Sequence, residues 1–312
     1  RRVQGLRQVL WTRAVSPPPV APATPEGRAA AAYLGLAVGD ALGATVEFLT
    51  PREIQHRHGT HRDIVGGGWL HLKPGQVTDD TTMSLALGEA ILAAGHVDAR
   101  AAADAFDAWM RAKPVDIGNT VRRNLIAYRK TGHPEAPLSE HDAGNGAAMR
   151  VLPVALATFG QPPDVVAAAC RAQGHVTHHN LLSDAACDTL AAMVHDLLAG
   201  QGLDTARRHA DALAAAHPLF AWQGKRRDNP SGYVVETLQA VFQALFSTHS
   251  FEACLVDVVN RGGDADTTGA IAGMLAGACY GPDAIPTRWR KAVDTEVRQR
   301  VEWQAVALLK RG

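Results

Sequence analysis

The chain has 312 residues, of which 46% are hydrophobic, 20% charged and 5% aromatic, so it is long enough to bury a sizeable core. Its 31 basic and 31 acidic residues cancel, which excludes a general electrostatic attraction to nucleic acid or to an anionic membrane. The four cysteines form no Cys-x-x-Cys pair, which favours buried thiols in a reducing cytoplasm, and no apolar run reaches the roughly 18 residues of a transmembrane segment.

The first 26 residues differ from the rest of the chain. Four arginines precede the first acidic residue, Glu26, and five prolines crowd residues 17–25. An arginine-rich, acid-poor start resembles a transit peptide, although a disordered extension or a misassigned start codon explains it as well. We predict a disordered extension over 1–26 that adds nothing to the core, followed by a single domain over 27–312.

A helix rich in alanine is predicted over residues 29–42. Its glycines recur every four residues, at Gly35, Gly39 and Gly43. Small residues at this spacing share one helix face and suit close packing. The helix carries Asp40 and leads to Glu47, a glutamate among apolar neighbours that is either exposed or directed towards a functional site.

The motif Thr78-Asp79-Asp80-Thr81 follows a glycine-rich loop over 59–77 and opens a helix predicted over about 78–95. Asp and Thr at a helix start are ordinary caps, and negative charge is favoured there by the helix dipole. A cap needs only one side chain, however, whereas this motif offers two adjacent carboxylates. Oxygen ligands of this kind suit a hard divalent cation.

Two further helices are predicted. The first covers 98–111, and the second starts within the segment 114–120 and runs to residue 130. Asp116 stands at the start of the second one, where it is either the helix cap or a functional carboxylate. After a polar loop over 132–144, Gly144-Asn145-Gly146 leads into a helix predicted over 147–159. Exposed backbone amides at such a start favour a phosphate group, although a single Gly-x-Gly is weak evidence.

Helices are also predicted over 163–173, 181–200, 203–216 and 233–247. His175, His178 and His179 lie between the first two. Paired histidines suggest a transition metal, but no Cys or further His has ligand spacing nearby, so hydrogen bonding is the favoured interpretation. Tyr233 opens the last of these helices and either belongs to the core or stacks on a flat ligand.

A second acidic motif, Asp264-Ala265-Asp266-Thr267, runs directly into an apolar helix over 270–280. Gly269, Gly273 and Gly277 share one face of this helix, which predicts the close approach of another helix. A last helix is predicted over 287–309, and no β-type alternation persists anywhere. The chain is therefore predicted to be all-α, with the two acidic motifs converging on cations that relieve their mutual repulsion.

Four motifs taken together resemble the ADP-ribosylglycohydrolase family, from about residue 27 to the C-terminus. They are Gly-Asp-Ala-Leu-Gly (39–43) with Glu47, Thr-Asp-Asp-Thr (78–81), Gly-Asn-Gly (144–146) and Gly-Gly-Asp-Ala-Asp-Thr (262–267). The resemblance implies a compact orthogonal helical bundle with two divalent cations, Mg²⁺ or Mn²⁺, at the base of a cleft. By motif position, it implies as metal ligands Thr78, Asp79, Asp80, Asp264, Asp266 and Thr267.

The resemblance also implies roles for residues around the metals. Glu47 corresponds to the family's glutamate beside the cations, and Asp116 to the aspartate that faces the guanidinium of an arginine-linked substrate. Together with Asp80, these are the candidate catalytic carboxylates, and the sequence does not distinguish which one is the general base. The other implied substrate-binding residues are Gly118, Gly144, Asn145, Gly146, His178 and Tyr233.

The implied function is a metal-dependent hydrolase that removes ADP-ribose from an arginine of a target protein, with the nitrogenase iron protein as the expected target. Two alternatives stay open: the same fold acting on a serine or ester linkage, and a catalytically silent module that binds ADP-ribose. The resemblance further implies a PII-type signal protein that holds the enzyme at the membrane periphery. None of the residues identifies that interface.

Overall fold

The computed structural model describes residues 23–311, and the all-α prediction is confirmed over this range. Its α-helices are α2 (Pro25–Ala44), α3 (Pro51–His58), α4 (Asp79–Ala94), α5 (Ala99–Arg111), α6 (Asn119–Thr131), α7 (Leu152–Ala157), α8 (Pro163–Gly174), α9 (Leu181–Leu198), α10 (Leu203–Ala216), α11 (Val234–Ser247), α12 (Phe251–Val259), α13 (Ala265–Tyr280), α14 (Thr287–Ala292) and α15 (Thr295–Leu309). Short 3₁₀ turns cover Ala148–Arg150, Pro218–Phe220 and Pro282–Ala284. No helix within the described residues has the length and apolarity that a bilayer crossing needs.

Several boundaries differ from the sequence-based prediction. Helix α2 begins at Pro25, two residues inside the predicted extension, whereas residues 1–22 of that extension lie outside the described residues. The helix predicted over 147–159 is a 3₁₀ turn followed by the short helix α7. The helix predicted over 287–309 is divided, because the side chain of Asp294 caps a new helix, α15.

Helices α3 and α12 were not predicted. The first is eight residues long and mostly polar, so it lacks an apolar stripe, yet Thr50 and Glu53 form a complete capping box at its start. That Thr-x-x-Glu pattern is a sequence signal for a helix start. Helix α12 begins with a side-chain cap from Ser250. Local capping residues therefore mark both helices that hydrophobic periodicity missed.

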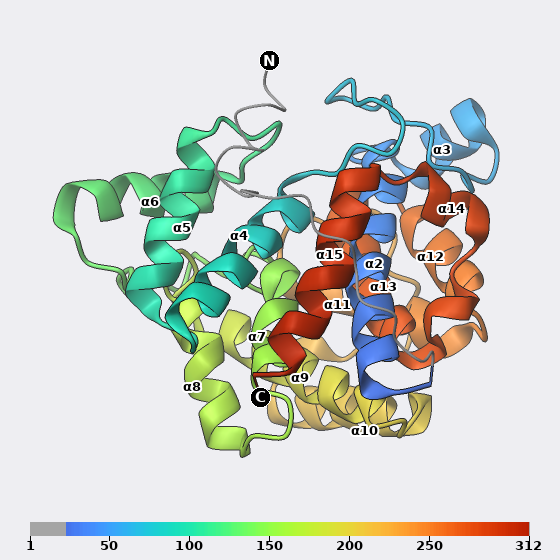
Figure 1. The fold of residues 1–312 in the computed structure, drawn as a ribbon. Coiled ribbons are helices and arrows are strands. Elements are labelled where there is room, and N and C mark those ends of the chain that lie inside the picture. Colours follow the sequence, from blue (N-terminus) through green and yellow to red (C-terminus); the bar gives the residue numbers. More distant parts are fainter. Residues whose placement is uncertain (1–22, 312) are drawn as a thin grey trace.

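Helices α2 and α13 form the central pair of the fold (Figure 1). The predicted glycine face of α13 packs directly on the glycine face of α2. A Cβ atom built on Gly39 would lie 1.8 Å from the carbonyl oxygen of Gly269, and one on Gly35 would lie 2.1 Å from that of Gly273. Only glycine fits such a backbone contact, which brings Asp40 of α2 against the first turn of α13.

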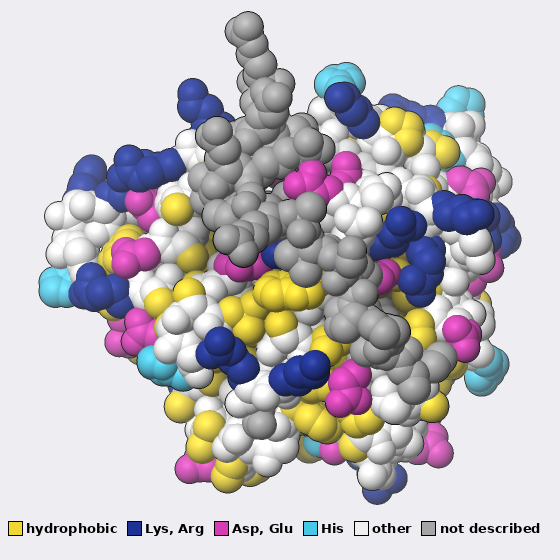
Figure 2. Space-filling model, in the orientation of Figure 1, with side chains coloured by type: hydrophobic (Ala, Val, Ile, Leu, Met, Phe, Trp, Pro, Cys, Tyr) yellow, Lys and Arg dark blue, Asp and Glu magenta, His cyan; other side chains and the backbone are white. Residues whose placement is uncertain are grey.

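The remaining helices surround this pair. In Figure 1, α5, α6 and α8 lie on one side of it and α12 and α14 on the other, while α15 packs along α2. On the described part of the face shown in Figure 2, Lys and Arg side chains are interspersed with Asp and Glu. This mixture agrees with the equal numbers of the two charge types in the sequence.

Candidate active site

The residues at the N-cap positions of α4 and α13 do not cap their own helices. Thr78 and Asp264 occupy the N-cap positions, and neither side chain makes a capping hydrogen bond. Asp40 of α2 caps α4 from outside, because its carboxylate accepts the backbone N–H groups of Thr78 (3.0 Å) and Thr81 (3.2 Å) together with both hydroxyls. Simple capping therefore does not explain Asp79 and Asp80.

The two acidic motifs, far apart in the sequence, meet in the structure. Carboxylate oxygens of Asp40, Asp80 and Asp266 lie within 4.8 Å of one another, and so do those of Glu47, Asp264 and Asp266. Asp266 belongs to both groups and links them. The Thr78 hydroxyl lies 3.1 Å from Asp80 Oδ2 and 3.2 Å from Asp266 Oδ2, although it has a single proton to donate.

This crowding changes the protonation of the carboxyl groups. Burial, followed by the charges of Asp116 and Asp40, raises the pKa of Asp79 to about 8. Burial also raises the pKa values of Asp80 and Asp266 well above their ordinary value. The charge of Asp40 adds to the effect on Asp80, and the charge of Asp80 adds to the effect on Asp266. Asp80 Oδ1 is buried without a hydrogen-bond partner in the described structure. Buried, mutually repelling carboxylates with an orphaned oxygen can hold divalent cations.

A cleft of about 440 Å³ opens above this acidic cluster. This volume falls within the usual range for small-molecule sites. Five carboxylates line it: Glu47, Asp79, Asp116, Asp264 and Asp266. Polar side chains and glycines surround them, among them Thr267, Gly118, Asn119, Thr120, Gly144, Asn145, Gly146 and His178. Thr78 and Asp80 are buried and are absent from the residues that line the cleft.

Asp116 lies in the turn before α6. Gly118 is the N-cap of that helix and makes no side-chain cap, so Asp116 is not the helix cap that the sequence allowed. Its Oδ1 accepts the N–H of the adjacent Ile117 at 2.8 Å. Burial raises the pKa of Asp116, and a hydrogen bond from Ile117 opposes this effect. The carboxylate is therefore available to a ligand in the cleft.

The Gly-Asn-Gly segment differs from a phosphate-binding loop in its hydrogen bonding. The backbone N–H of Asn145 donates to the carbonyl of Gly232 at 2.9 Å, so it is not free to bind a phosphate. The Asn145 side chain instead donates to Asp264 Oδ2 at 2.7 Å and orients that carboxylate. A Cβ atom on Gly146 would lie 2.5 Å from the ring of His178, so glycine makes room for the imidazole.

His178 is buried beside the cleft as a neutral ring. Burial and then the charge of Arg150 lower its pKa to about 3, and the Thr177 hydroxyl lies 2.8 Å from Nδ1. The fully buried Arg150 holds this segment in place through hydrogen bonds to Gln173 and Thr177. Tyr233 pairs with Gly144 in an isolated bridge but is absent from the residues that line the cleft, so its stacking role stays a prediction.

Sequence reasoning gave no role to two groups that the structure brings to the site. One is Asp40, whose signal was its place in the Gly-Asp-Ala-Leu-Gly motif. The other is the aromatic pair Phe48 and Trp69, which lines the cleft and whose side chains are 62% and 48% exposed. An exposed aromatic residue in a loop leaves no periodic signal in a sequence, so only the structure could identify this pair.

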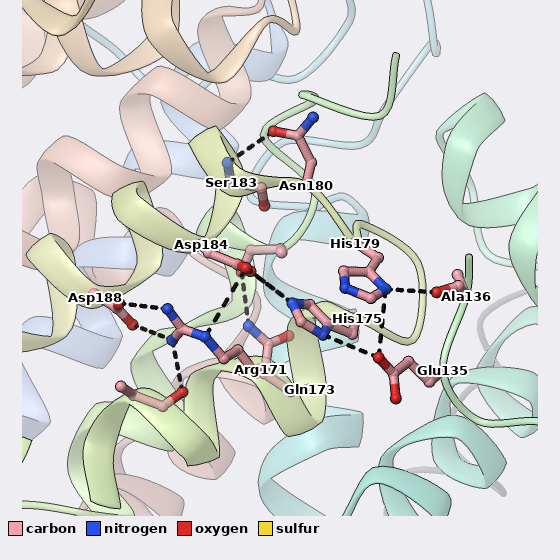
Figure 3. A network of polar contacts seen from close by, with 12 residues as sticks. Glu135, Ala136, Arg171, Gln173, His175, His179, Asn180, Ser183, Asp184 and Asp188 are labelled. Atoms are coloured by element: carbon pink, nitrogen blue, oxygen red, sulfur yellow. Dashed lines mark hydrogen bonds and ion pairs between the residues drawn. The ribbon is translucent and has the colours of Figure 1, made fainter. Parts of the chain in front are cut away.

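The two other histidines of this segment, His175 and His179, form a hydrogen-bonded cluster outside the cleft (Figure 3). Nε2 of His175 lies 2.9 Å from Asp184, and Nδ1 of His179 lies 2.8 Å from the Ala136 carbonyl. Glu135 Oε1 lies within 3.6 Å of both rings, which are stacked 3.7 Å apart at 20°. Imidazole lone pairs lie in the ring plane, so two nearly parallel rings cannot both direct them at one ion. Hydrogen bonding remains the better interpretation.

The fold is all-helical over the described residues, and its acidic cleft offers the oxygen ligands of a divalent-cation site. The family model described as ADP-ribosylglycohydrolase matches residues 21–311, and the chain belongs to this family. Its members hydrolyse linkages to ADP-ribose, and the predicted fold type and enzyme class are thereby confirmed.

Individual relatives agree with this assignment. The chain is 51% identical to the ADP-ribosyl-[dinitrogen reductase] glycohydrolase of Rhodospirillum rubrum, over 90% of this chain and 95% of that one. It is 35% identical to the ADP-ribosylarginine hydrolase Tri1 of Pseudomonas putida (strain GB-1), over 86% of this chain and 76% of the relative. A solved structure described as an ADP-ribosylglycohydrolase-related protein complex matches with a TM-score of 0.82 and 35% identity, over 92% of this chain and 98% of that chain.

Proposed function

We propose that this protein removes ADP-ribose from an arginine side chain of a target protein, with dinitrogenase reductase, the nitrogenase iron protein, as the target. The observation that carries the proposal is Asp116, a half-buried carboxylate in a cleft whose charged lining side chains are all acidic. A cationic guanidinium is the acceptor that such a cleft favours, and a carboxylate can bind it through two hydrogen bonds. The names of the relatives from R. rubrum and P. putida support the same substrate class.

We further propose that the site holds two divalent cations, Mg²⁺ or Mn²⁺. The proposed ligands are Thr78, Asp79, Asp80, Asp264, Asp266 and Thr267. The orphaned Asp80 Oδ1 and the raised pKa values around it support this assignment. When bound, such cations supply Lewis acidity and orient the ribose hydroxyls.

The side chains of the cleft have separate tasks in the proposed reaction. Cleavage at the anomeric carbon passes through a transition state with positive charge on the ribose, which nearby carboxylates stabilise. Asp116 binds the guanidinium that leaves, while Glu47 and Asp116 are the two candidates for moving the proton. Asn145 holds the orientation of Asp264, and the neutral ring of His178 offers hydrogen bonding to the nucleotide.

The experiment that tests this function is turnover of an ADP-ribosylated arginine protein in the presence of Mn²⁺, followed by mass spectrometry of the modified peptide. The wild-type protein is expected to remove the modification, and Asp79→Ala and Asp264→Ala are expected to lose this activity. Full activity in both variants would exclude the metal assignment. Binding of ADP-ribose in calorimetry without any hydrolysis would instead support the silent binding module.

Replacement of Asp116 is expected to weaken hydrolysis of the arginine linkage in particular. Asp116→Asn keeps the side-chain shape but removes the charge that pairs with the guanidinium, which should lower kcat/KM roughly 10- to 100-fold for this linkage. Comparison of arginine-linked with serine-linked substrates measures the selectivity. Asp188→Asn is a suitable control, because Asp188 pairs with Arg171 outside the cleft. Equal losses on both linkages would contradict the pairing of Asp116 with the guanidinium, and faster wild-type turnover of the serine linkage would support the serine or ester alternative.

Removal of metal is expected to make stability depend on pH in an unusual direction. The pKa values of Asp40, Asp79 and Glu47 are raised to about 6, 8 and 9, mainly by burial, so the folded protein retains protons that the unfolded chain releases. In a chelator, stability should therefore fall as pH rises from about 4 to about 9. The increase in Tm on adding Mn²⁺ should grow over the same window, and a pH-independent increase in thermal melts would contradict this prediction.

Association with a PII-type signal protein, implied by the family resemblance, stays a prediction. A pull-down with purified PII protein and nucleotide tests it directly.

A further inference from the structure

We propose that Trp69 is a positioning residue for the reaction, because its indole fixes the carboxylate of Glu47 at the edge of the acidic cluster. The inference rests on the proposed function and extends it to a residue that no sequence motif identified. Three observations carry it: the anchoring of the loop that bears Trp69, the hydrogen bond between the two side chains, and the attachment of Glu47 to the second acidic motif.

The loop that bears Trp69 is anchored to the end of α2. Gly67 and Leu72 exchange two backbone hydrogen bonds of 2.8 and 3.0 Å, so Trp69 lies at the tip of a tight hairpin. The Thr45 hydroxyl donates to the carbonyl of Gly66 at 2.8 Å. Gly68 has a positive φ of 69°, and a Cβ atom there would lie 2.5 Å from the carbonyl oxygen of Ala44. Close backbone contact thus sets the hairpin beside the turn that contains Glu47.

The indole N–H of Trp69 donates to Glu47 Oε2 at 2.7 Å. Among the described residues, it is the one side chain that hydrogen-bonds this carboxylate. Burial, followed by the charge of Asp264, disfavours the ionised form of Glu47, and the indole hydrogen bond counteracts both effects. The ring also packs against Phe48, with centroids 5.4 Å apart, which limits its rotation.

The turn that carries Glu47 is bound to the second acidic motif. The backbone N–H of Phe48 donates to the carbonyl of Gly263 at 2.7 Å, and the N–H of Gly263 donates to the carbonyl of Leu49 at 3.0 Å. Phe48 adopts a positive φ of 66°, which is unfavourable for a bulky residue. This strained turn places Glu47 next to Asp264, and repulsion between the two carboxylates would displace the Glu47 side chain unless a donor held it.

The consequence for the reaction is specific. Among the described residues, Trp69 hydrogen-bonds Glu47 and none of the proposed metal ligands, so its loss should misplace one carboxylate while the cations and the ADP-ribose remain bound. Partners that orient an active-site group typically contribute about 10- to 100-fold in activity. We therefore expect the effect in kcat, with little change in KM or in the affinity for Mn²⁺.

The test compares two substitutions at position 69 in the full chain. Trp69→Phe keeps an aromatic ring but removes the N–H, and kcat is expected to fall about 10-fold or more, with KM and the calorimetric Mn²⁺ affinity within about twofold of the wild type. Trp69→Gln removes the ring but restores an N–H donor at the same number of bonds from Cα. It is expected to recover a large part of kcat. Trp222→Phe, the same chemical change at a residue outside the cleft, is the control.

The outcomes separate this proposal from the function on which it rests. A wild-type protein that releases no ADP-ribose from the arginine substrate overturns the proposed function. An active wild type with an equally active Trp69→Phe overturns the positioning role alone. If the Gln variant is less active than the Phe variant, the ring contributes more than the hydrogen bond, and the positioning role is again overturned.

Discussion

Asp266→Asn is expected to abolish hydrolysis and, at the same time, to raise the melting temperature of the metal-free protein. Asp266 lies in both carboxylate groups of the site, so its replacement removes a proposed ligand at the point where they join. The loss of activity should be at least about 100- to 1,000-fold, the range seen when one strong electrostatic group is removed from an active site.

The gain in stability follows from the raised pKa of Asp266. Burial, together with the charges of Asp80 and Glu47, disfavours its ionised form in the folded protein. Each pKa unit of this kind corresponds to about 1.4 kcal/mol at a pH where the unfolded chain is ionised. Asparagine carries no charge and can still accept the N–H of Thr267, so we expect the free energy of unfolding of the metal-free protein to increase at neutral pH.

The same substitution at Asp257 provides a control with the opposite sign. Burial raises the pKa of Asp257, but hydrogen bonds and ion pairs with Arg261 and Arg226 outweigh it and leave the pKa lowered. Asp257→Asn should therefore reduce the melting temperature and leave hydrolysis unchanged. For both variants, thermal melts in a chelator measure the melting temperature of the metal-free protein, and turnover assays with Mn²⁺ measure hydrolysis. A lower melting temperature for Asp266→Asn would contradict the prediction, because it would mean that the metal-free folded protein stabilises the ionised carboxylate of Asp266.

Gly39→Ala is expected to cause a large loss of stability, although it adds only one methyl group. The added Cβ would lie 1.8 Å from the carbonyl oxygen of Gly269, so α2 and α13 would have to separate by about 1 Å or more. Overpacking in a core commonly lowers the free energy of unfolding by about 1–3 kcal/mol. Here the added methyl group would meet backbone atoms, so no flexible side chain can move to relieve the clash. We expect at least about 3 kcal/mol, a large fraction of the 5–15 kcal/mol that is usual for a folded domain.

Gly174→Ala is the matched control in another helix. A Cβ atom at Gly174 would meet Ala147 at 3.6 Å, which is an ordinary contact. Alanine also favours a helix over glycine by up to about 1 kcal/mol, so this variant should be neutral or slightly more stable than the wild type. Urea denaturation of both variants measures the difference. Equal stabilities for Gly39→Ala and Gly174→Ala would show that the α2–α13 contact is looser than its backbone distances indicate.

Activity should fall together with stability in Gly39→Ala, because the same contact positions the site. Asp40 follows Gly39 directly and caps α4, while Gly269 lies in α13 three residues after Asp266, about one turn further along the helix. A shift between these helices would therefore separate Asp40 and Asp80 from Asp266. Addition of Mn²⁺ should stabilise this variant less than it stabilises the wild type. Calorimetry measures the corresponding decrease in Mn²⁺ affinity.

Local sequence patterns were sufficient to predict the all-α fold, most of the helices and the acidic motifs. Helix periodicity and the spacing of the glycines are local properties of a sequence. These patterns also indicated that α13 would contact a second helix closely. Short helices such as α3, whose stability depends on capping and on a single buried isoleucine, Ile54, left no periodic pattern. The roles of Asp40, Asn145 and Trp69 could not be predicted, because each depends on a partner far away in the sequence.

Two acidic motifs at helix starts, and small residues along the faces of the two central helices, can be read from the amino-acid sequence. The meeting of these motifs, with Asp80 and Asp266 in one group, and the absence of capping bonds from Thr78 and Asp264 depend on the folded arrangement. The physical reason is the backbone contact between α2 and α13. It brings Asp40 of α2 against the first turn of α13, and Asp40 in turn accepts the first backbone N–H groups of α4. Asp79, Asp264 and Asp266 then line the cleft, while Asp80 is buried beneath it.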